Sequence, residues 1–234
     1  MLRQKIRNRL AHRLGVPEIP FALDRLSKAG LRPRQIFDIG AYRGDFARCC
    51  LNVWPKTKVA CFEALENKIV QLKHLEQQNF NVRVFPGLMG AEHKENVPLH
   101  EAETASSVLS EHHDQSFPVT YHTMRTVDEI VQRHFEGCSP DFLKLDVQGY
   151  ELEVLKGAEQ SLNGMQAILA EVNLLDIHDG VPLLAEVIGW LSKRKWAAYD
   201  ICALTRRPLD QALWQADFIF VPDDSPLRIN KHWG

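Results

Sequence analysis

Residues 36–46 read IFDIGAYRGDF, and this stretch decides the fold. An apolar run ends on the carboxylate of Asp38, and Gly40 and Gly44 follow before an apolar pattern with helical spacing begins. A buried strand that passes directly into a helix has this pattern. At Gly40 and Gly44 the connecting loop has no side chain, which suits either a tight structural turn or a ligand that touches the backbone. The stretch alone leaves both explanations open.

Strand-like and helix-like segments alternate on the C-terminal side of this stretch. Apolar runs typical of buried strands occur at residues 58–64, 81–87, 142–145, 165–173, 196–204 and 216–222. Helical patterns occur at residues 45–54, 67–78, 127–135, 150–156 and 182–195. Because a strand, a crossover helix and a further strand form a right-handed parallel unit, we expect an α/β fold with a mostly parallel sheet. The last two strands are expected to pair antiparallel at one edge.

The middle of the chain departs from this alternation. Residues 95–102 and 118–127 have strand-like patterns, and the polar segment between them has the composition of a loop. We therefore expect a β-rich insertion at about residues 91–126. At 234 residues the chain suits one decorated α/β domain, which we place at residues 31–234.

Residues 1–30 are predicted to form a basic, amphipathic helical extension of this domain. Lys and Arg are frequent in the first thirteen residues, and apolar side chains recur at four-residue spacing at Leu2, Ile6, Leu10 and Leu14. A helix of this kind packs on its own domain, on a second subunit of a homodimer, or on an anionic membrane surface. The sequence does not choose among these partners.

Composition and charge exclude several classes of protein. The net charge is −2, so no overall positive field favours a nucleic-acid partner. No apolar run is long enough to cross a membrane, and no signal-peptide pattern follows the basic N-terminus. The five cysteines include no C-x-x-C pair and fit buried thiols in a reducing compartment. We therefore expect a cytoplasmic protein.

Acidic residues end three of the predicted strands, at Asp38, Glu63 and Asp146. The carboxyl ends of parallel strands form the edge where such sheets bind ligands. The loop after Asp38 has neither the glycine spacing of a dinucleotide fingerprint nor the Gly-Lys-Ser/Thr of a phosphate loop. A carboxylate there disfavours a pyrophosphate and favours a cationic or hydroxyl-bearing group. Glu63 either accepts both hydroxyls of a ribose or is a solvated residue at a strand end.

These residues resemble the FkbM family of class I S-adenosylmethionine-dependent methyltransferases. The resemblance rests on FDIGAYRGDFA (37–47), VACFEALE (59–66), TVDEI (126–130) and above all PDFLKLDVQGYELEVLKGAE (140–159). It covers roughly residues 34–222 and leaves out the basic N-terminal segment. The family implies a Rossmann-like, seven-stranded, mostly parallel sheet with helices on both faces and an antiparallel last strand.

The resemblance also implies the cofactor, S-adenosyl-L-methionine, and the residues that bind it. In this family the loop after the first strand holds the methionine part, the acidic residue after the second strand takes the ribose, and the residue after the third strand bounds the adenine. The positions so assigned are Asp38, Gly40, Ala41, Gly44, Glu63, Leu88 and Asp146. The family's reactions are mainly O-methylations of sugars, glycolipids or polyketide-derived hydroxyls, so we expect a small-molecule or glycan acceptor.

Asp146, Glu171 and His178 are the candidates for the acceptor side of the site. Asp146 can orient the acceptor hydroxyl, contact the cofactor's amine or bind a cation, and it can also cap the helix that follows. Glu171 ends the next core strand, and His178 lies in the loop after it. Transfer to oxygen needs a base such as a carboxylate or histidine, although a lone loop histidine is more often solvated. Lys144 is expected to point away from Asp146.

No metal site is predicted. His112 and His113 form a pair in the polar middle segment, but their spacing to His100 and His122 is not diagnostic of a metal site. Two other functions remain open at this point. One is an NAD-dependent enzyme of Rossmann type, and the other is a non-catalytic partner protein that retains the fold.

Overall fold

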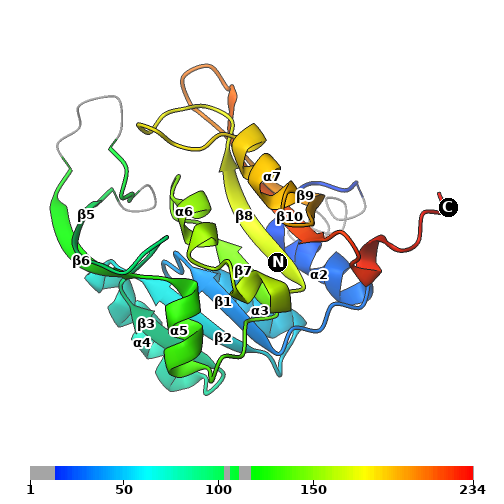
Figure 1. The fold of residues 1–234 in the computed structure, drawn as a ribbon, viewed down its shortest axis with the longest axis horizontal. Helices are drawn as coiled ribbons and strands as arrows, with labels where there is room; N and C mark the ends of the chain where they lie inside the picture. Colours follow the sequence, from blue (N-terminus) through cyan, green and yellow to red (C-terminus); the bar gives the residue numbers. More distant parts are fainter. Residues whose placement is uncertain (1–13, 103–105, 111–116, 234) are drawn as a thin grey trace, which may run out of the picture.

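The computed structural model describes residues 14–102, 106–110 and 117–233. A central twisted sheet with helices on both faces makes up most of the molecule (Figure 1). The predicted basic helix in the first thirteen residues lies outside the described ranges, as do His112 and His113.

Strands and helices follow one another along the chain nearly as the sequence pattern indicates. The strands of the main sheet are β1 (Gln35–Ile39), β2 (Lys58–Glu63), β3 (Val82–Pro86), β7 (Phe142–Leu145), β8 (Ala167–Asn173), β9 (Trp196–Arg206) and β10 (Leu213–Pro222). A smaller sheet contains β4 (Leu88–Met89), β5 (Lys94–His100) and β6 (Val119–Arg125). The helices are α2 (Ile19–Lys28), α3 (Asp45–Val53), α4 (Glu66–Gln78), α5 (Val127–His134), α6 (Glu151–Lys156) and α7 (Leu184–Ser192), with short 3-10 turns η2 (Ser161–Gly164) and η3 (Pro226–Arg228).

The main sheet has seven strands in the order β3-β2-β1-β7-β8-β10-β9. The first five pair in parallel, whereas β10 runs antiparallel to both β8 and β9. The Rossmann-like sheet and its antiparallel last strand are therefore confirmed. The order reverses between β1 and β7, so the carboxyl ends of these two strands flank the position where such sheets bind ligands.

Each face of the main sheet has its own core, because side chains alternate along a strand. Phe37 and Ile39 of β1 pack in the core beneath α5, α6 and α7. Ile36 packs in the core beneath α2, α3 and α4. Asp38 shares the face of Ile36 and is fully buried there. A carboxylate in that position requires a partner.

Helix α2 packs into the second of these cores. Leu23 and Leu26 are buried, and Arg25 forms an ion pair of 2.7 Å with Asp200 of β9. Residues 19–28, part of the predicted extension, thus pack on the domain itself, and the boundary at residue 30 stays a prediction. Within the described ranges, no helix combines the length and the apolar content needed to cross a lipid bilayer.

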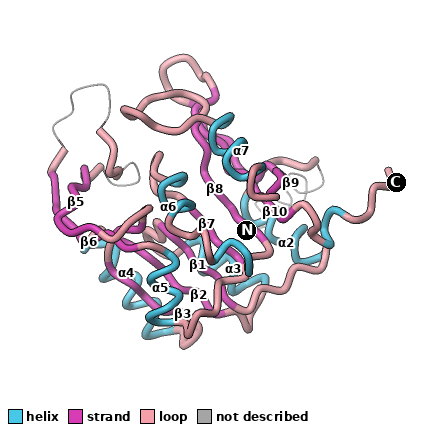
Figure 2. The backbone as a smooth tube through the Cα atoms, in the orientation of Figure 1, coloured by secondary structure: helices cyan, strands magenta, loops and turns pink. Residues whose placement is uncertain are grey.

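The middle insertion forms the smaller sheet, which has the order β4-β6-β5. It stands beside the β3 end of the main sheet, away from β9 and β10 (Figure 1). Residues 106–110 lead from it back to the ligand-binding edge, where the Ser107 hydroxyl donates to the backbone oxygen of Gln148 at 2.7 Å. The Ser110 hydroxyl donates to the Asp179 carboxylate at 3.0 Å. The insertion therefore reaches the loops that follow β7 and β8 (Figure 2).

Candidate functional site

The glycines after β1 are required first by the protein itself. Gly40 has a φ of +73°, and a Cβ there would collide with the backbone oxygen of Asp146. Gly44 has a φ of +79°, and a Cβ would lie 2.7 Å from a methyl group of Leu75 in α4. Both positions combine a left-handed backbone with close approach to a neighbouring element. The tight turn alone therefore explains both glycines, and any contact with a ligand would be a second role.

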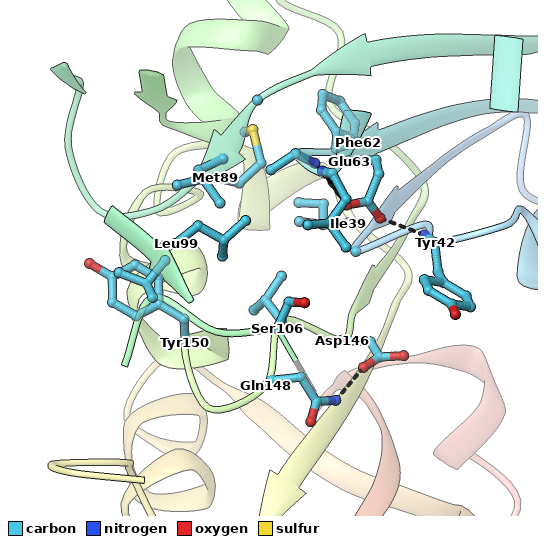
Figure 3. A pocket seen from close by; sticks show the side chains of 17 residues that line it. Ile39, Tyr42, Phe62, Glu63, Met89, Leu99, Ser106, Asp146, Gln148 and Tyr150 are labelled. Carbon is cyan, nitrogen blue, oxygen red and sulfur yellow. Dashed lines mark hydrogen bonds between the residues drawn. The ribbon is translucent and has the colours of Figure 1, made fainter. Parts of the chain in front are cut away.

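A pocket lies at the carboxyl ends of β1, β2 and β7. Glu63 and Asp146 line it on opposite sides (Figure 3). The apolar part of its wall includes Ile39, Phe62, Leu88, Met89 and Leu99. An apolar slot with a few fixed polar groups is the usual form of a small-molecule site.

Glu63 is held rigidly at the rim of this pocket. One carboxylate oxygen accepts the backbone N–H groups of Ala64 and Leu65 at 2.8 and 3.0 Å, and the other accepts that of Tyr42 at 2.7 Å. A carboxylate has about four acceptor positions, so about one remains for a ligand hydroxyl. Ribose binding by Glu63 stays a prediction. The sequence suggested that Glu63 accepts both ribose hydroxyls, whereas in this conformation its carboxylate has an acceptor position for about one.

Lys144 stands between two of the predicted acidic residues. Its Nζ lies 3.2 Å from a carboxylate oxygen of Asp38 and 3.2 Å from one of Asp146, and it donates to the backbone oxygen of Gly40 at 2.8 Å. The expectation that Lys144 points away from Asp146 is wrong, because residues two apart on a strand share a face. The buried carboxylate of Asp38 thus has its partner, and Lys144 links β1 to β7.

The charges of this trio follow from their surroundings. Burial raises the pKa of Asp38, while the neighbouring Lys144 opposes that rise. Burial alone would lower the pKa of Lys144, but the carboxylates of Asp146 and Asp38 raise it above its ordinary value. Lys144 therefore remains a cation at neutral pH. Asp38 is not among the described residues that line the pocket, so its direct contact with a ligand stays a prediction.

A second pocket lies beside the first, on the side of α2 and α3. Its wall includes Ile19, Pro20, Ala41, Arg43, Phe46, Cys49 and Lys144. The two pockets share Gly40, Tyr42 and Asp146. Asp146 therefore lies where the two pockets adjoin. Ala41 thus lies at the second pocket, whereas Gly44 lies at the α3–α4 contact.

The loop after β1 uses its own N–H groups inside the protein. Those of Gly40 and Ala41 both donate to the backbone oxygen of Phe62 at 3.1 and 3.0 Å, and that of Gly44 donates to Ala41 at 2.8 Å. The N–H of Tyr42 is bonded to Glu63. A pyrophosphate cradle needs several backbone N–H groups that point at the ligand. The geometry therefore disfavours a dinucleotide at this loop.

Glu171 lies behind the pocket wall. One of its carboxylate oxygens accepts from the side-chain amides of Gln148 at 2.8 Å and Gln215 at 2.7 Å. Burial raises the pKa of Glu171 well above its ordinary value, and the nearby carboxylates of Asp146 and Glu151 add to the rise. Neither pocket has Glu171 among the described residues of its wall. The expected acceptor-side role of Glu171 therefore has no direct contact to support it.

His178 is buried in the loop after β8, with 1% of its surface exposed. It is likewise absent from the described walls of both pockets. Its role as a base stays a prediction. Asp146, whose side chain is 42% exposed, is the catalytic candidate that does reach them.

Asp146 does not cap the following helix. Its oxygens face Lys144 and the side-chain amide of Gln148. The buried carboxylate of Glu151 instead accepts the N–H groups of Val147 and Gly149, at 2.9 and 3.0 Å. Lys144, Gln148 and Glu151 were not singled out as site residues from the sequence. The signals were present, since Lys144 lies two residues before Asp146, and Gln148 precedes a glycine in the loop.

Metal ligation finds no support in the part of the chain that the structure describes. No group of three or more His, Cys, Asp or Glu side chains there has the arrangement needed to hold a metal ion. His122 lies instead 2.7 Å from the hydroxyl of Thr120. The polar side chains that line the pockets at the strand ends include the carboxylates of Glu63 and Asp146, the amine of Lys144 and the amide of Gln148.

Comparison with known proteins gives a family for this arrangement. The model of the methyltransferase FkbM domain matches residues 38–197. The crystal structure of methyltransferase FkbM from Methylobacillus flagellatus KT is 15% identical, with a TM-score of 0.53, over 86% of this chain and 48% of that chain. Magnesium protoporphyrin IX methyltransferase from Synechocystis PCC 6803, solved with bound S-adenosylmethionine, is 8% identical over 87% of this chain and 79% of its own, with a TM-score of 0.49. None of the curated proteins compared matches the sequence.

The two kinds of match support different statements. The structural likeness, at these low identities, concerns the fold alone, and the chain spans about half the length of the Methylobacillus protein. The family match begins at Asp38 and takes in Glu63, Asp146 and Glu171. S-adenosyl-L-methionine is the cofactor of that family. This chain belongs to the FkbM methyltransferase family.

Proposed function

We propose that this chain transfers a methyl group from S-adenosyl-L-methionine to a hydroxyl oxygen of a sugar, glycan or glycolipid. The observation that carries the proposal is the position of Asp146, a half-exposed carboxylate on the shared wall of two adjoining pockets. A carboxylate in this place serves both a cationic cofactor and an acceptor hydroxyl. The proposed oxygen acceptor also agrees with the resemblance noted in the sequence.

The residues present fit the cofactor in three parts. The apolar wall that contains Phe62, Leu88 and Met89 suits an adenine ring. Glu63 offers its remaining acceptor position to a ribose hydroxyl. The second pocket, which begins at Asp146, suits the short charged tail. In this proposal Glu63 contacts the ribose, Leu88 the adenine, and Ala41 the charged tail.

Asp146 performs the acid–base step in this proposal. When bound, the cofactor would supply a methyl carbon on a positively charged sulphur. An acceptor oxygen held in line with the carbon–sulphur bond would attack that carbon, and the sulphur would leave as a neutral thioether. Asp146 accepts the hydrogen of the acceptor hydroxyl and so orients the oxygen and takes up its proton. The Nζ of Lys144 lies 3.2 Å from one carboxylate oxygen of Asp146 and holds that carboxylate in place.

Both alternative functions have a specific observation against them. An NAD-dependent enzyme needs N–H groups at the first loop for the pyrophosphate, and here those of Gly40, Ala41 and Tyr42 are bonded within the protein. A non-catalytic relative has no need to keep a partly exposed carboxylate, paired with a lysine, between two pockets. Asp146 and Lys144 therefore support an enzyme.

The N-terminal segment and the cellular location belong to the proposal only as expectations. We keep the segment 1–13, which its sequence predicts to be a basic helix, as a contact for a second subunit or an anionic membrane surface. A cytoplasmic location remains the setting that best suits the buried thiols of Cys50, Cys61 and Cys202.

A methyl-transfer screen tests the proposed function. The native chain is incubated with methyl-labelled S-adenosylmethionine and a panel of free sugars, sugar nucleotides and glycolipids, and label transfer is measured. We expect transfer to at least one hydroxyl-bearing acceptor, and we expect Asp146→Asn to lower its rate at least about 100-fold. Glu159→Gln, at a surface carboxylate, is the matched control. Transfer only to a nitrogen or carbon acceptor, or full activity in Asp146→Asn, contradicts the proposal.

A further inference from the structure

The carboxylate of Asp146 is held from two sides. One oxygen lies 3.2 Å from the Nζ of Lys144, and the other accepts from the side-chain nitrogen of Gln148 at 3.0 Å. Figure 3 shows the amide of Gln148 directed at Asp146 across the lower rim of the pocket. A half-exposed carboxylate is free to rotate unless both oxygens are bound, so these two donors fix its direction.

Each donor is backed by a buried carboxylate on a neighbouring strand. Asp38 of β1 lies behind Lys144, and Glu171 of β8 lies behind Gln148. The nitrogen of Gln148 has two hydrogens, one for Asp146 at 3.0 Å and one for Glu171 at 2.8 Å. Because carboxylates and carboxylic acids both present acceptor oxygens, the amide of Gln148 is oriented by two neighbours at once.

Glu171 is itself fixed. Its oxygen also accepts from Gln215 of β10 at 2.7 Å, and 9% of the residue is exposed. The main chain of Gln148 is held as well, in a left-handed conformation with φ of +52°, by the hydroxyl of Ser107 on its carbonyl oxygen. The relay from Gln215 through Glu171 and Gln148 to Asp146 therefore consists of groups that packing has already ordered.

We propose that Glu171 is a positioning residue, which acts through the amide of Gln148 to aim the Asp146 carboxylate at the junction of the two pockets. The inference rests on the proposed function, since that function gives Asp146 its ligand. It replaces the catalytic role expected for Glu171 by an indirect one. The buried Glu171 never meets cofactor or acceptor, and its removal acts only through the direction of Asp146.

A double-mutant cycle on cofactor affinity tests this inference. Calorimetry with S-adenosylmethionine is carried out on the native chain, Asp146→Asn, Glu171→Leu and the double variant. We expect Glu171→Leu to weaken binding about tenfold when Asp146 is present, and less than about twofold in the Asp146→Asn background. A residue that only supports the fold would weaken binding by the same factor in both backgrounds, and that result overturns the inference.

Two further variants separate positioning from loss of stability. Glu171→Gln keeps an oxygen for the Gln148 amide and is expected to restore binding to within about threefold of native. Val172→Ala removes buried packing from the same strand without touching the relay, and its affinity is expected to stay native. Native affinity in Glu171→Leu, or an unchanged affinity in Asp146→Asn, also overturns the inference. Failure of the native chain to bind S-adenosylmethionine rejects instead the proposed function.

Discussion

Single residues in this site have structural roles and also line the pockets. Gly40 packs against the backbone of Asp146 and also lines both pockets. Glu63 accepts hydrogen bonds from three backbone N–H groups and also lines the first pocket. Substitution at either position therefore changes stability and binding together. Residues that are buried beside the site, without touching a ligand, are better suited to isolate one effect.

Glu151 gives such an isolated effect through pH. Burial raises its pKa from 4.5 to about 7, so between these values the folded protein holds a proton that the unfolded chain has released. The folded state then binds more protons, and its stability falls as the pH rises through this window. At about 1.4 kcal/mol per pH unit, the loss is on the order of 3 kcal/mol by pH 8.

The neutral variant Glu151→Gln checks this expectation. It keeps an oxygen for the N–H groups of Val147 and Gly149 but cannot ionise. Urea denaturation at pH 5 and pH 8 should show that native stability falls relative to that of Glu151→Gln by roughly 3 kcal/mol between the two conditions. Glu153→Gln on the same helix is the matched control. An equal difference between native and Glu151→Gln at both pH values would show that Glu151 does not carry this proton.

At the scale of elements, the sequence predicts the main sheet well and the contacts between elements poorly. Periods of 2 and 3.6 place the strands and helices, and the carboxylates of Asp38, Glu63 and Asp146 mark their carboxyl ends. The same period of 2 places the side chains of Lys144 and Asp146 on one face, so the expectation that Lys144 points away from Asp146 was a misreading of the pattern. The partner of Glu171 did not follow, because Gln148 and Gln215 lie on separate elements that only the folded chain brings together.

The insertion shows the same limit. Its strands are readable from sequence, but residues 106–110 looked like loop and gave no sign of where they dock. Ser107 proves to be buried, with its hydroxyl donating to Gln148 and accepting the N–H of Leu109 at 3.0 Å. A short polar segment has no periodicity from which its docking position could be inferred.

We expect Ser107→Ala to loosen the insertion from the main domain. The change leaves the buried oxygen of Gln148 and the N–H of Leu109 without their hydroxyl partner, which costs about 1–3 kcal/mol of unfolding free energy. Chemical denaturation measures the loss. Ser110→Ala in the same segment is the control, because its hydrogen bond to Asp179 is exposed and its removal should cost less than about 0.5 kcal/mol. Equal stability of the two variants would rule out the docking role of Ser107.

At the scale of the whole molecule, the fold and the family agree on one ligand-binding edge. The strand order turns between β1 and β7, and the insertion brings its returning segment to the same edge. Two adjoining pockets there share Asp146. The family fixes the cofactor class, whereas the acceptor is a proposal.

Isothermal titration calorimetry of the native chain with S-adenosylmethionine and, separately, with NAD tests the central claim most directly. The proposal places the nucleoside and the charged tail of S-adenosylmethionine across the two pockets. The N–H groups that a pyrophosphate needs are instead bonded to Phe62 and Glu63 of β2. We therefore expect one S-adenosylmethionine to bind per chain with a dissociation constant in the micromolar range, which corresponds to a binding free energy of about −8 kcal/mol. Titration with NAD is expected to give no heat of binding. Binding of NAD without binding of S-adenosylmethionine would contradict the account.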